Sequence, residues 1–239
     1  MRKSVVAIVA AAAVSGCQVR AQEDGGPTVS RNYEVGNFQQ IEVAGPYDVD
    51  VRTGGNASVS ATGSQKLLEK TVVEVKGDKL VIHPENGHGF FHFGWSTHGK
   101  ASFVVTVPQL SGATIAGSGD IRVDKVQGNS FEGVVAGSGG LNVAAVDVQQ
   151  LKLAIAGSGG VKAAGKAQAA KYEIAGSGDV EAGAVQTQDL KVSIAGSGGI
   201  KAHSAGTADV SIMGSGDVEV TGGAKCKISK AGSGDVRCS

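Results

Sequence analysis

Apolar side chains alternate with other residues through the second half of the chain, in short runs that each lead into the same triplet. Leu151, Leu153 and Ile155 occupy every second position before one triplet, and Val161 and Ala163 do so after it. A period of two is the spacing of β-strands, in which alternate side chains face the same way. The pattern therefore predicts strands on both sides of each triplet, and no stretch of the repeat has a helical period.

The triplet is Gly-Ser-Gly, and it occurs seven times at spacings of 20, 20, 19, 20, 18 and 18 residues. A third, more polar segment, such as Val146 to Gln150, lies between one triplet and the next. Three short strands cannot form a compact unit alone, but coils stacked on one another give each strand a parallel partner. The repeat predicts an all-β fold, a three-sided β-solenoid with about 18–20 residues per coil and a thin aliphatic interior.

The glycines of the triplets suit sharp corners, because glycine permits positive φ and close approach of backbones. Stacked corners would align the intervening serines at the strand spacing of about 4.8 Å, which allows hydrogen bonds along the stack. A catalytic serine is the alternative, but seven equivalent serines without a paired histidine favour a structural role. The predicted corner ladder consists of Ser118, Ser138, Ser158, Ser177, Ser197, Ser215 and Ser233.

A column of residues just after the triplets tests the register independently, because its charges alternate in sign from Lys162 onward. Opposite charges on neighbouring strands stabilise a sheet by about 0.2–1 kcal/mol each, and like charges cost similar amounts. The alternation supports stacking and predicts a solvated face. The column consists of Arg122, Asn142, Lys162, Glu181, Lys201, Glu219 and Arg237.

The residue directly after each triplet is aspartate in four coils and glycine in three. A calcium-binding solenoid would repeat a glycine-aspartate signature about every nine residues. The spacing here is about twice as long and has gaps, so turn chemistry is favoured over calcium binding. The aspartates are Asp120, Asp179, Asp217 and Asp235, and the glycines are Gly140, Gly160 and Gly199.

The ends of the repeat differ from its middle. Lys230 occupies a slot that holds isoleucine in earlier coils, which suits a terminal coil that no further coil covers. Cys226 and Cys238 fall in inward columns, where a disulfide would pin this coil; a metal held by two thiols is the weaker alternative. Near the N-terminus, residues 41–51 align with the first corner as a degenerate coil, and Lys76-Gly77-Asp78 predicts a hairpin turn.

The first residues predict a targeting segment. Arg2 and Lys3 precede an apolar stretch, Val5 to Val14, that is too short to span a bilayer. Small residues before Cys17 resemble a bacterial lipobox, which would make residues 1–17 a signal peptide and Cys17 the lipidated residue. Ordinary cleavage after Ala21 is the alternative. Either way the mature chain is exported, and a lipid would anchor it in the outer membrane or periplasm of a bacterium.

Composition and charge narrow the function classes. Lys plus Arg and Asp plus Glu each total 22, so no basic excess favours nucleic acid. The 38 glycines and 4 prolines in 239 residues stay below the combined level of about 25–30% that is typical of disorder. We expect a polar tether at 18–37 and one solenoid domain at 38–239, with an irregular part at 38–108 and regular repeats at 109–239.

Several segments together resemble the putative auto-transporter adhesin, head GIN domain family. They are Phe38 through Val51, the strand Leu80-Val81-Ile82, Val105 to Pro108, and the repeated Ala-Gly-Ser-Gly-Asp corners. The resemblance covers nearly all of the mature chain. It implies a right-handed parallel β-helix on an exported or lipid-anchored bacterial envelope protein, and it implies no catalytic residue.

The most unusual segment is the loop 84–100, which holds four of the ten aromatic residues and three of the five histidines. One hypothesis is that its aromatic side chains cover an open face of the solenoid. Another is that they form a platform for a sugar ring or a protein. Zinc or copper binding is a third, although no carboxylate or cysteine completes a recognisable spacing. The residues concerned are Phe90, Phe91, Phe93 and Trp95, with His88, His92 and His98.

These features favour a non-catalytic, cofactor-free envelope protein, adhesin-like or structural, that binds a polysaccharide or an envelope protein. One alternative is a β-helix enzyme that degrades polysaccharides, whose chemistry needs clustered carboxylates or cations on one face. The other alternative is a metal-binding envelope protein that uses the His-rich loop.

Overall fold

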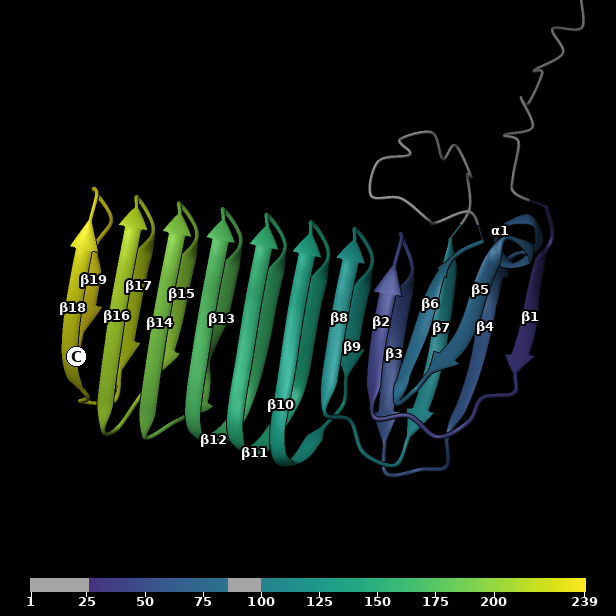
Figure 1. The fold of residues 1–239 in the computed structure, drawn as a ribbon, viewed down its shortest axis with the longest axis horizontal. Helices are drawn as coiled ribbons and strands as arrows, with labels where there is room; N and C mark the ends of the chain where they lie inside the picture. Colours follow the sequence, from purple (N-terminus) through teal and green to yellow (C-terminus); the bar gives the residue numbers. More distant parts are fainter. Residues whose placement is uncertain (1–25, 86–99) are drawn as a thin grey trace, which may run out of the picture.

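The computed structural model describes residues 26–85 and 100–239, and nearly all of their regular structure is β-strand. The strands stand side by side along one long axis, with the N-terminal strands at one end and the C-terminus at the other (Figure 1). Residues 112–239 form stacked parallel coils, so the predicted all-β solenoid is confirmed. Its strands are β8 (Gly112–Gly117), β9 (Asp120–Val123), β10 (Val126–Gly137), β11 (Gly140–Gly157), β12 (Gly160–Gly176), β13 (Asp179–Gln186), β14 (Asp189–Gly196), β15 (Gly199–His203), β16 (Thr207–Gly214), β17 (Asp217–Thr221), β18 (Lys225–Ala231) and β19 (Val236–Cys238).

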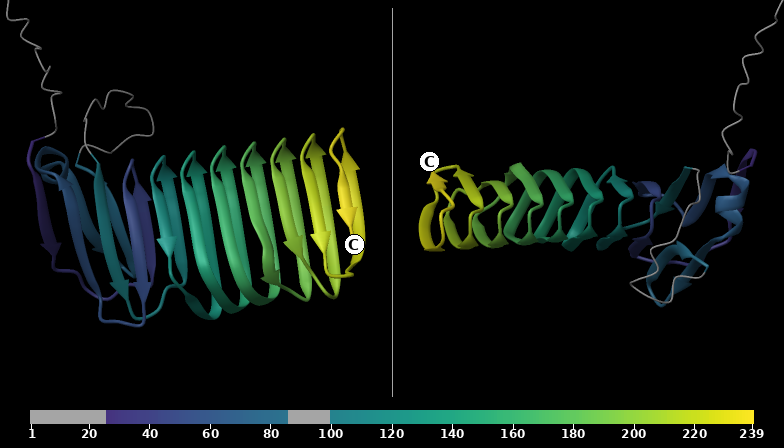
Figure 2. Two further views of the ribbon diagram at one scale, coloured as in Figure 1. Left: turned by 180° about the vertical axis from the view of Figure 1, so that it is seen from behind. Right: turned by 90° about the horizontal axis from the view of Figure 1, so that it is seen from above.

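One coil shows how the sequence makes three sides. In β11, buried and exposed side chains alternate except at Ala144–Ala145 and Gln149–Gln150, where two exposed residues follow each other. After each exposed pair, the buried positions are shifted by one residue along the sequence. The chain bends at these pairs, and the next side of the coil begins there. With the Gly-Ser-Gly corner, these bends divide the coil into three sides, which carry two, two and three inward side chains. Figure 2 shows the stacked coils from above.

The thin interior is filled by side chains of complementary size within a coil. The coil of β12 turns three alanines inward, Ala163, Ala167 and Ala170, and the space they leave holds the fully buried ring of Tyr172. The Tyr172 hydroxyl has no hydrogen-bond partner among the described residues. Burial raises the pKa of this phenol far above its ordinary value. The hydroxyl is therefore a destabilising polar group in an otherwise apolar core.

The N-terminal part keeps the solenoid register but is built differently. Residues 41–51 form the predicted degenerate coil, since β2 pairs in parallel with β8 and β3 with β9. The predicted hairpin at Gly77 joins β5 to β6. The elements of this part are β1 (Thr28–Tyr33), β2 (Gln40–Ala44), β3 (Asp48–Thr53), β4 (Ser58–Ser64), α1 (Gln65–Glu69), β5 (Thr71–Lys76), β6 (Lys79–Pro84) and β7 (Ala101–Val107).

Two features of this end differ from the expectation. Residues 28–33 were expected in a polar tether but form β1, which pairs antiparallel with β4. Tyr33 of β1 packs against Phe103, with ring centroids 6.4 Å apart, and this contact holds the polar strand in place. The short helix α1 was not predicted, and it buries Leu67 and Leu68 at the end of the core. The interior is therefore closed on the N-terminal side.

Candidate functional site

The Gly-Ser-Gly corners stack along one edge of the solenoid. A Cβ added to Gly139 would lie 2.1 Å from the carbonyl oxygen of Gly119, so only glycine allows this approach. The backbone N–H of Ser158 donates to the carbonyl of Gly137 at 2.9 Å, and the corners at Ser138, Ser177, Ser197, Ser215 and Ser233 repeat this bond. The seven serine side chains are exposed, and no hydrogen bond joins two of their hydroxyls in the described structure. The hydrogen bonds that connect stacked corners are thus formed by backbone groups, and not by the serine hydroxyls as expected.

The aspartates after the corners take part in turn chemistry, as predicted. The Oδ1 atom of Asp120 accepts a hydrogen bond from the N–H of Gly140 at 2.9 Å, and Asp179 does the same for Gly199 at 2.8 Å. Asp217 makes the same bond to the N–H of Asp235 at 2.8 Å, so each of these three carboxylates accepts from the backbone of the following coil. Within residues 26–85 and 100–239, no three His, Cys, Asp or Glu side chains gather as metal ligands.

The predicted alternating column lies in register on the face that follows the triplets. Lys162 is paired with Glu181, and their charged groups are 3.2 Å apart. The column also extends one coil toward the N-terminus, where Arg122 lies 3.7 Å from Asp50. These side chains are more than half exposed, so solvent weakens each pair. Their alternation is consistent with the observed register of neighbouring strands.

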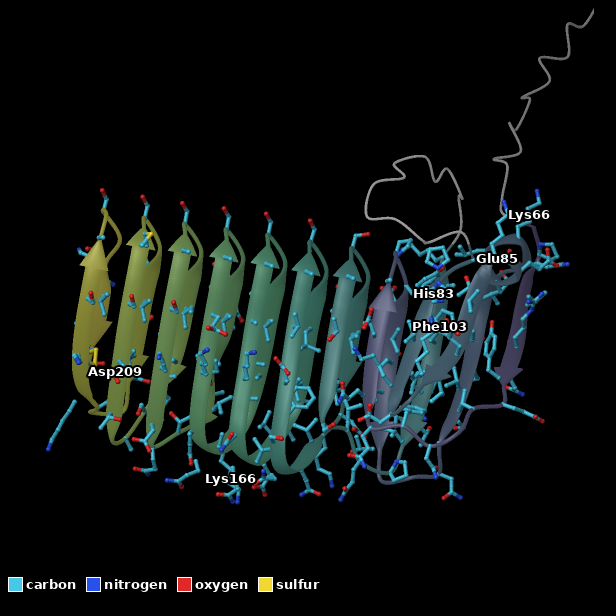
Figure 3. All side chains as sticks on the ribbon, in the orientation of Figure 1. Lys66, His83, Glu85, Phe103, Lys166 and Asp209 are labelled. Atoms are coloured by element: carbon cyan, nitrogen blue, oxygen red, sulfur yellow. A yellow bond between two sulfur atoms is a disulfide. The ribbon has the colours of Figure 1, made fainter. Side chains whose placement is uncertain are left out.

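The face that precedes the triplets carries a different pattern, which was not predicted from the sequence. Lys152, Lys171 and Lys191 stand in register on β11, β12 and β14, so three like charges follow one another at the strand spacing. Glu132 precedes this column and Asp209 follows it; Figure 3 labels Asp209 near the C-terminal end. The lysines could have been found by aligning the residues that precede each triplet.

A groove of about 630 Å³ runs along this face beside the lysine column. It is hollow in its middle because the small side chain of Ala169 stands between Gln150 and Asp189 in the neighbouring column. We call this hollow the lysine groove. Its charged lining consists of Glu132, Lys152, Lys171, Asp189, Lys191 and Asp209, and its uncharged polar lining of Gln40, Ser111, Ser130, Gln150 and Thr207.

The charges of the lysine groove balance, with three lysines and three carboxylates. Lys152 Nζ donates to Glu132 Oε1 at 2.7 Å, and this hydrogen bond raises the pKa of Lys152, so it stays protonated. Thr207 donates its hydroxyl proton to Asp189 at 2.8 Å. The lining therefore brings ammonium donors, carboxylate acceptors, amides and hydroxyls together along one hollow. Such a lining can hydrogen-bond a hydroxyl-rich neutral chain without leaving a net charge uncompensated.

Several predicted site residues lie outside the described residues. These are the lipidation candidate Cys17, the aromatic residues Phe90, Phe91, Phe93 and Trp95, and the histidines His88, His92 and His98. The predicted disulfide is confirmed: Cys226 and Cys238 are bonded, with Cα atoms 6.7 Å apart. No helix in the described part of the chain is long and apolar enough to cross a membrane.

Solved structures with the same fold support this architecture. A putative adhesin from Bacteroides fragilis superposes with a TM-score of 0.79 at 21% identity, covering 89% of this chain and 97% of that one. A putative lipid binding protein from Parabacteroides distasonis gives 0.69 at 24% identity, covering 90% and 98%. A putative adhesin from the same organism gives 0.68 at 21% identity, with the same coverage. No curated protein sequence is similar enough to count as a relative.

Two family models match the sequence itself. Residues 1–18 match the prokaryotic membrane lipoprotein lipid attachment site, a segment that includes Cys17. The protein is therefore an exported, lipid-anchored protein of the bacterial envelope. Residues 37–224 match the second model, which spans the degenerate coil and all but the last coil of the solenoid. The chain belongs to the putative auto-transporter adhesin, head GIN domain family.

Proposed function

We propose that this protein is a non-catalytic envelope rod that binds an extended, uncharged polysaccharide in the lysine groove. The observation that carries the proposal is the balanced lining of that groove, in which three lysines and three carboxylates line one hollow about 630 Å³ in volume. Sugar hydroxyls both donate and accept hydrogen bonds, and this lining offers both kinds of partner. A polyanion would meet three carboxylates, and a polycation would meet three ammonium groups.

The groove crosses the strands instead of running along them. Most of its lining comes from β10, β11, β12, β14 and β16, which belong to successive coils, and Gln40 of β2 and Ser111 complete it at the N-terminal end. Equivalent side chains therefore recur along the rod axis at about 4.8 Å. A polymer with a regular repeat can use several coils at once, and weak contacts to each coil then add up to useful affinity. The lipid anchor would hold this rod at the envelope surface.

The test compares two pairs of lysines on different faces. Lys171→Ala with Lys191→Ala removes two donors from the groove, while Lys162→Ala with Lys201→Ala removes two lysines from the alternating column. Two lost hydrogen bonds of about 0.5–1.5 kcal/mol each predict binding about 5- to 150-fold weaker for the groove variant. The control variant should bind like the wild type.

Binding is measured by calorimetry against neutral glucan, mannan, galactan and xylan, with polygalacturonate as the acidic probe. The proposal fails if no neutral polymer binds, or if both variants lose affinity equally. Binding to polygalacturonate alone, weakened by salt, would identify a polyanion site instead. Shortened polymer after incubation would support the enzymatic alternative, in which the groove carboxylates act on the chain.

A further inference from the structure

Three exposed lysines surround the short helix α1 at the N-terminal end of the rod. Lys66 lies in the helix and Lys70 is its C-cap residue, so the two stand one helical turn apart. The carbonyl oxygen of Lys100 accepts a hydrogen bond from the N–H of Ser64, the residue before α1, at 3.4 Å. None of the three lysines has an ion-pair partner within 4.0 Å in the described structure. We call them the α1 lysines.

The other charged groups around α1 leave this corner of the rod positive. Glu69 lies 3.6 Å from the guanidinium group of Arg31 and accepts a hydrogen bond from the Gln65 amide at 2.8 Å, so its charge is already engaged. Glu85 belongs to the same corner, because its N–H donates to the carbonyl oxygen of Lys70 at 2.8 Å. Four cations therefore stand beside two carboxylates, and the corner suits an anionic partner.

The lipid attachment segment leads into the same corner. Gly26 is the first described residue, and a Cβ added to it would contact the side chain of Lys66 at 3.7 Å; Figure 3 labels Lys66 at this end of the rod. Cys17 is the one cysteine of the lipid attachment segment, so the lipid would be attached to it. The chain from Cys17 to Gly26 spans at most about 32 Å even when fully extended. A bilayer that holds the lipid therefore lies within this distance of α1.

A second group of exposed cations lies too far away to compete. It consists of Lys225, Lys227 and Arg237 in the last coil. Ten successive strand pairings lead from β1 to β19, which places the last coil about 48 Å from β1 along the rod. The edge between the two ends carries the serine corners, which offer no charge to a membrane. The short reach of the tether therefore favours the α1 lysines as the cations that meet the membrane.

We propose that the α1 lysines form a docking surface for anionic lipid headgroups, which holds the N-terminal end of the rod against the membrane that carries its lipid. The reach of the tether and the positive charge of the corner support this assignment independently. A lysine next to an anionic bilayer surface favours contact about fivefold, the equivalent of about 1 kcal/mol. None of the α1 lysines lines the lysine groove, so the inference does not depend on the proposed binding of a polysaccharide.

The test uses the lipidated chain in vesicles of phosphatidylethanolamine and phosphatidylglycerol, with phosphatidylcholine vesicles as the uncharged comparison. A fluorescent label on Thr28→Cys, an exposed position that pairs with the residue before α1, reports contact through quenching by spin-labelled headgroups. The same label on Ser233→Cys reports the far end of the rod. The label reacts with the introduced thiol alone, because Cys17 carries the lipid and Cys226 is bonded to Cys238.

Two triple variants carry the same loss of charge at the two ends of the rod. The α1 variant is Lys66→Gln with Lys70→Gln and Lys100→Gln, and the control variant is Lys225→Gln with Lys227→Gln and Arg237→Gln. Three lost lysines shift the contact equilibrium about 100-fold, so quenching at Thr28 should fall in the α1 variant to the level seen with phosphatidylcholine. The control variant should be quenched like the wild type, and added salt should weaken quenching in both.

The wild type alone can overturn the proposal, whether or not the variants fold. The docking surface is wrong if quenching at Thr28 is no stronger with phosphatidylglycerol than with phosphatidylcholine. It is also wrong if the Ser233 label is quenched as strongly as the Thr28 label, because the rod would then lie flat on the membrane. Equal quenching of the α1 variant and the control variant would show that these lysines do not carry the contact.

Discussion

Four glycines, three at or next to a Gly-Ser-Gly corner and one within β10, distinguish the two reasons why this solenoid needs glycine. Gly157 combines a φ of 135° with a site where an added Cβ would lie 2.4 Å from the carbonyl oxygen of the preceding corner. Gly159 has the same clash, at 2.3 Å, without a positive φ. Gly128 has a φ of 142° but no atom within 4 Å of the added Cβ, and Gly160 has neither problem.

The structure sets the expected losses in the free energy of unfolding. A Cβ contact becomes ordinary near 3.4 Å, so alanine at Gly157 or Gly159 must separate two corners by about 1 Å. Overpacking of this size costs about 1–3 kcal/mol, and an unfavourable φ costs about 1–3 kcal/mol. We expect about 2–6 kcal/mol for Gly157→Ala, about 1–3 kcal/mol each for Gly159→Ala and Gly128→Ala, and less than about 0.5 kcal/mol for Gly160→Ala.

Urea unfolding followed by circular dichroism measures these differences, provided that the slope with denaturant is the same in all variants. Amide exchange at the altered corner shows whether the loss is local or spreads to neighbouring coils. If Gly159→Ala is no more destabilising than Gly160→Ala, the corners separate freely and close backbone approach does not explain their composition. If Gly128→Ala is neutral, positive φ carries no cost in this fold.

Three further predictions concern single groups. Tyr172→Phe removes a buried hydroxyl without a described partner and should raise the free energy of unfolding by about 1–3 kcal/mol; an unchanged or lower melting temperature would mean that the hydroxyl is satisfied. Burial raises the pKa values of Tyr33, Tyr47 and Tyr172 above 10.0. The unfolded chain therefore releases these protons at a lower pH than the folded chain does. The free energy of unfolding should fall as the pH rises above about 10, by up to about 1.4 kcal/mol per pH unit for each phenol. Unfolding curves from pH 9 to 11 should show a shallower fall for Tyr172→Phe, and equal slopes would contradict the assignment. Asp179→Ala loses the carboxylate that accepts from Gly199 and should cost about 0.5–1.5 kcal/mol with faster exchange of that amide, whereas unchanged exchange would show that the bond is not formed in solution.

The regular half of the fold could be predicted from the sequence because each coil repeats the same short sequence pattern. The alternation of apolar and polar residues predicts the strands, and the Gly-Ser-Gly triplets predict the corners. The column that contains Lys162 and Glu181 predicts the register between neighbouring coils. The cysteines could be paired because both fall in inward columns of one terminal coil. The repeat thus predicts which distant residues lie side by side, and a sequence without repeats usually does not predict such contacts.

The irregular end and the candidate groove could not be predicted in this way. β1 has only Val29 and Tyr33 as apolar residues, and its place depends on packing against Phe103. The five residues of α1 are too few for a periodic pattern, and tertiary contacts of Leu67 and Leu68 decide their structure. The lysine groove depends on Ala169, a small residue whose effect appears only when its neighbours on adjacent coils are known.

The stacked corners make the length of this rod a discrete quantity. Every corner contacts only the corners before and after it, through the same backbone bonds. Gain or loss of one unit of 18–20 residues would therefore change the reach of the molecule by about 4.8 Å and leave both ends intact. Duplication of a single repeat is thus a conservative change in this gene product. Partial insertions are not, because they break the alignment of every later corner.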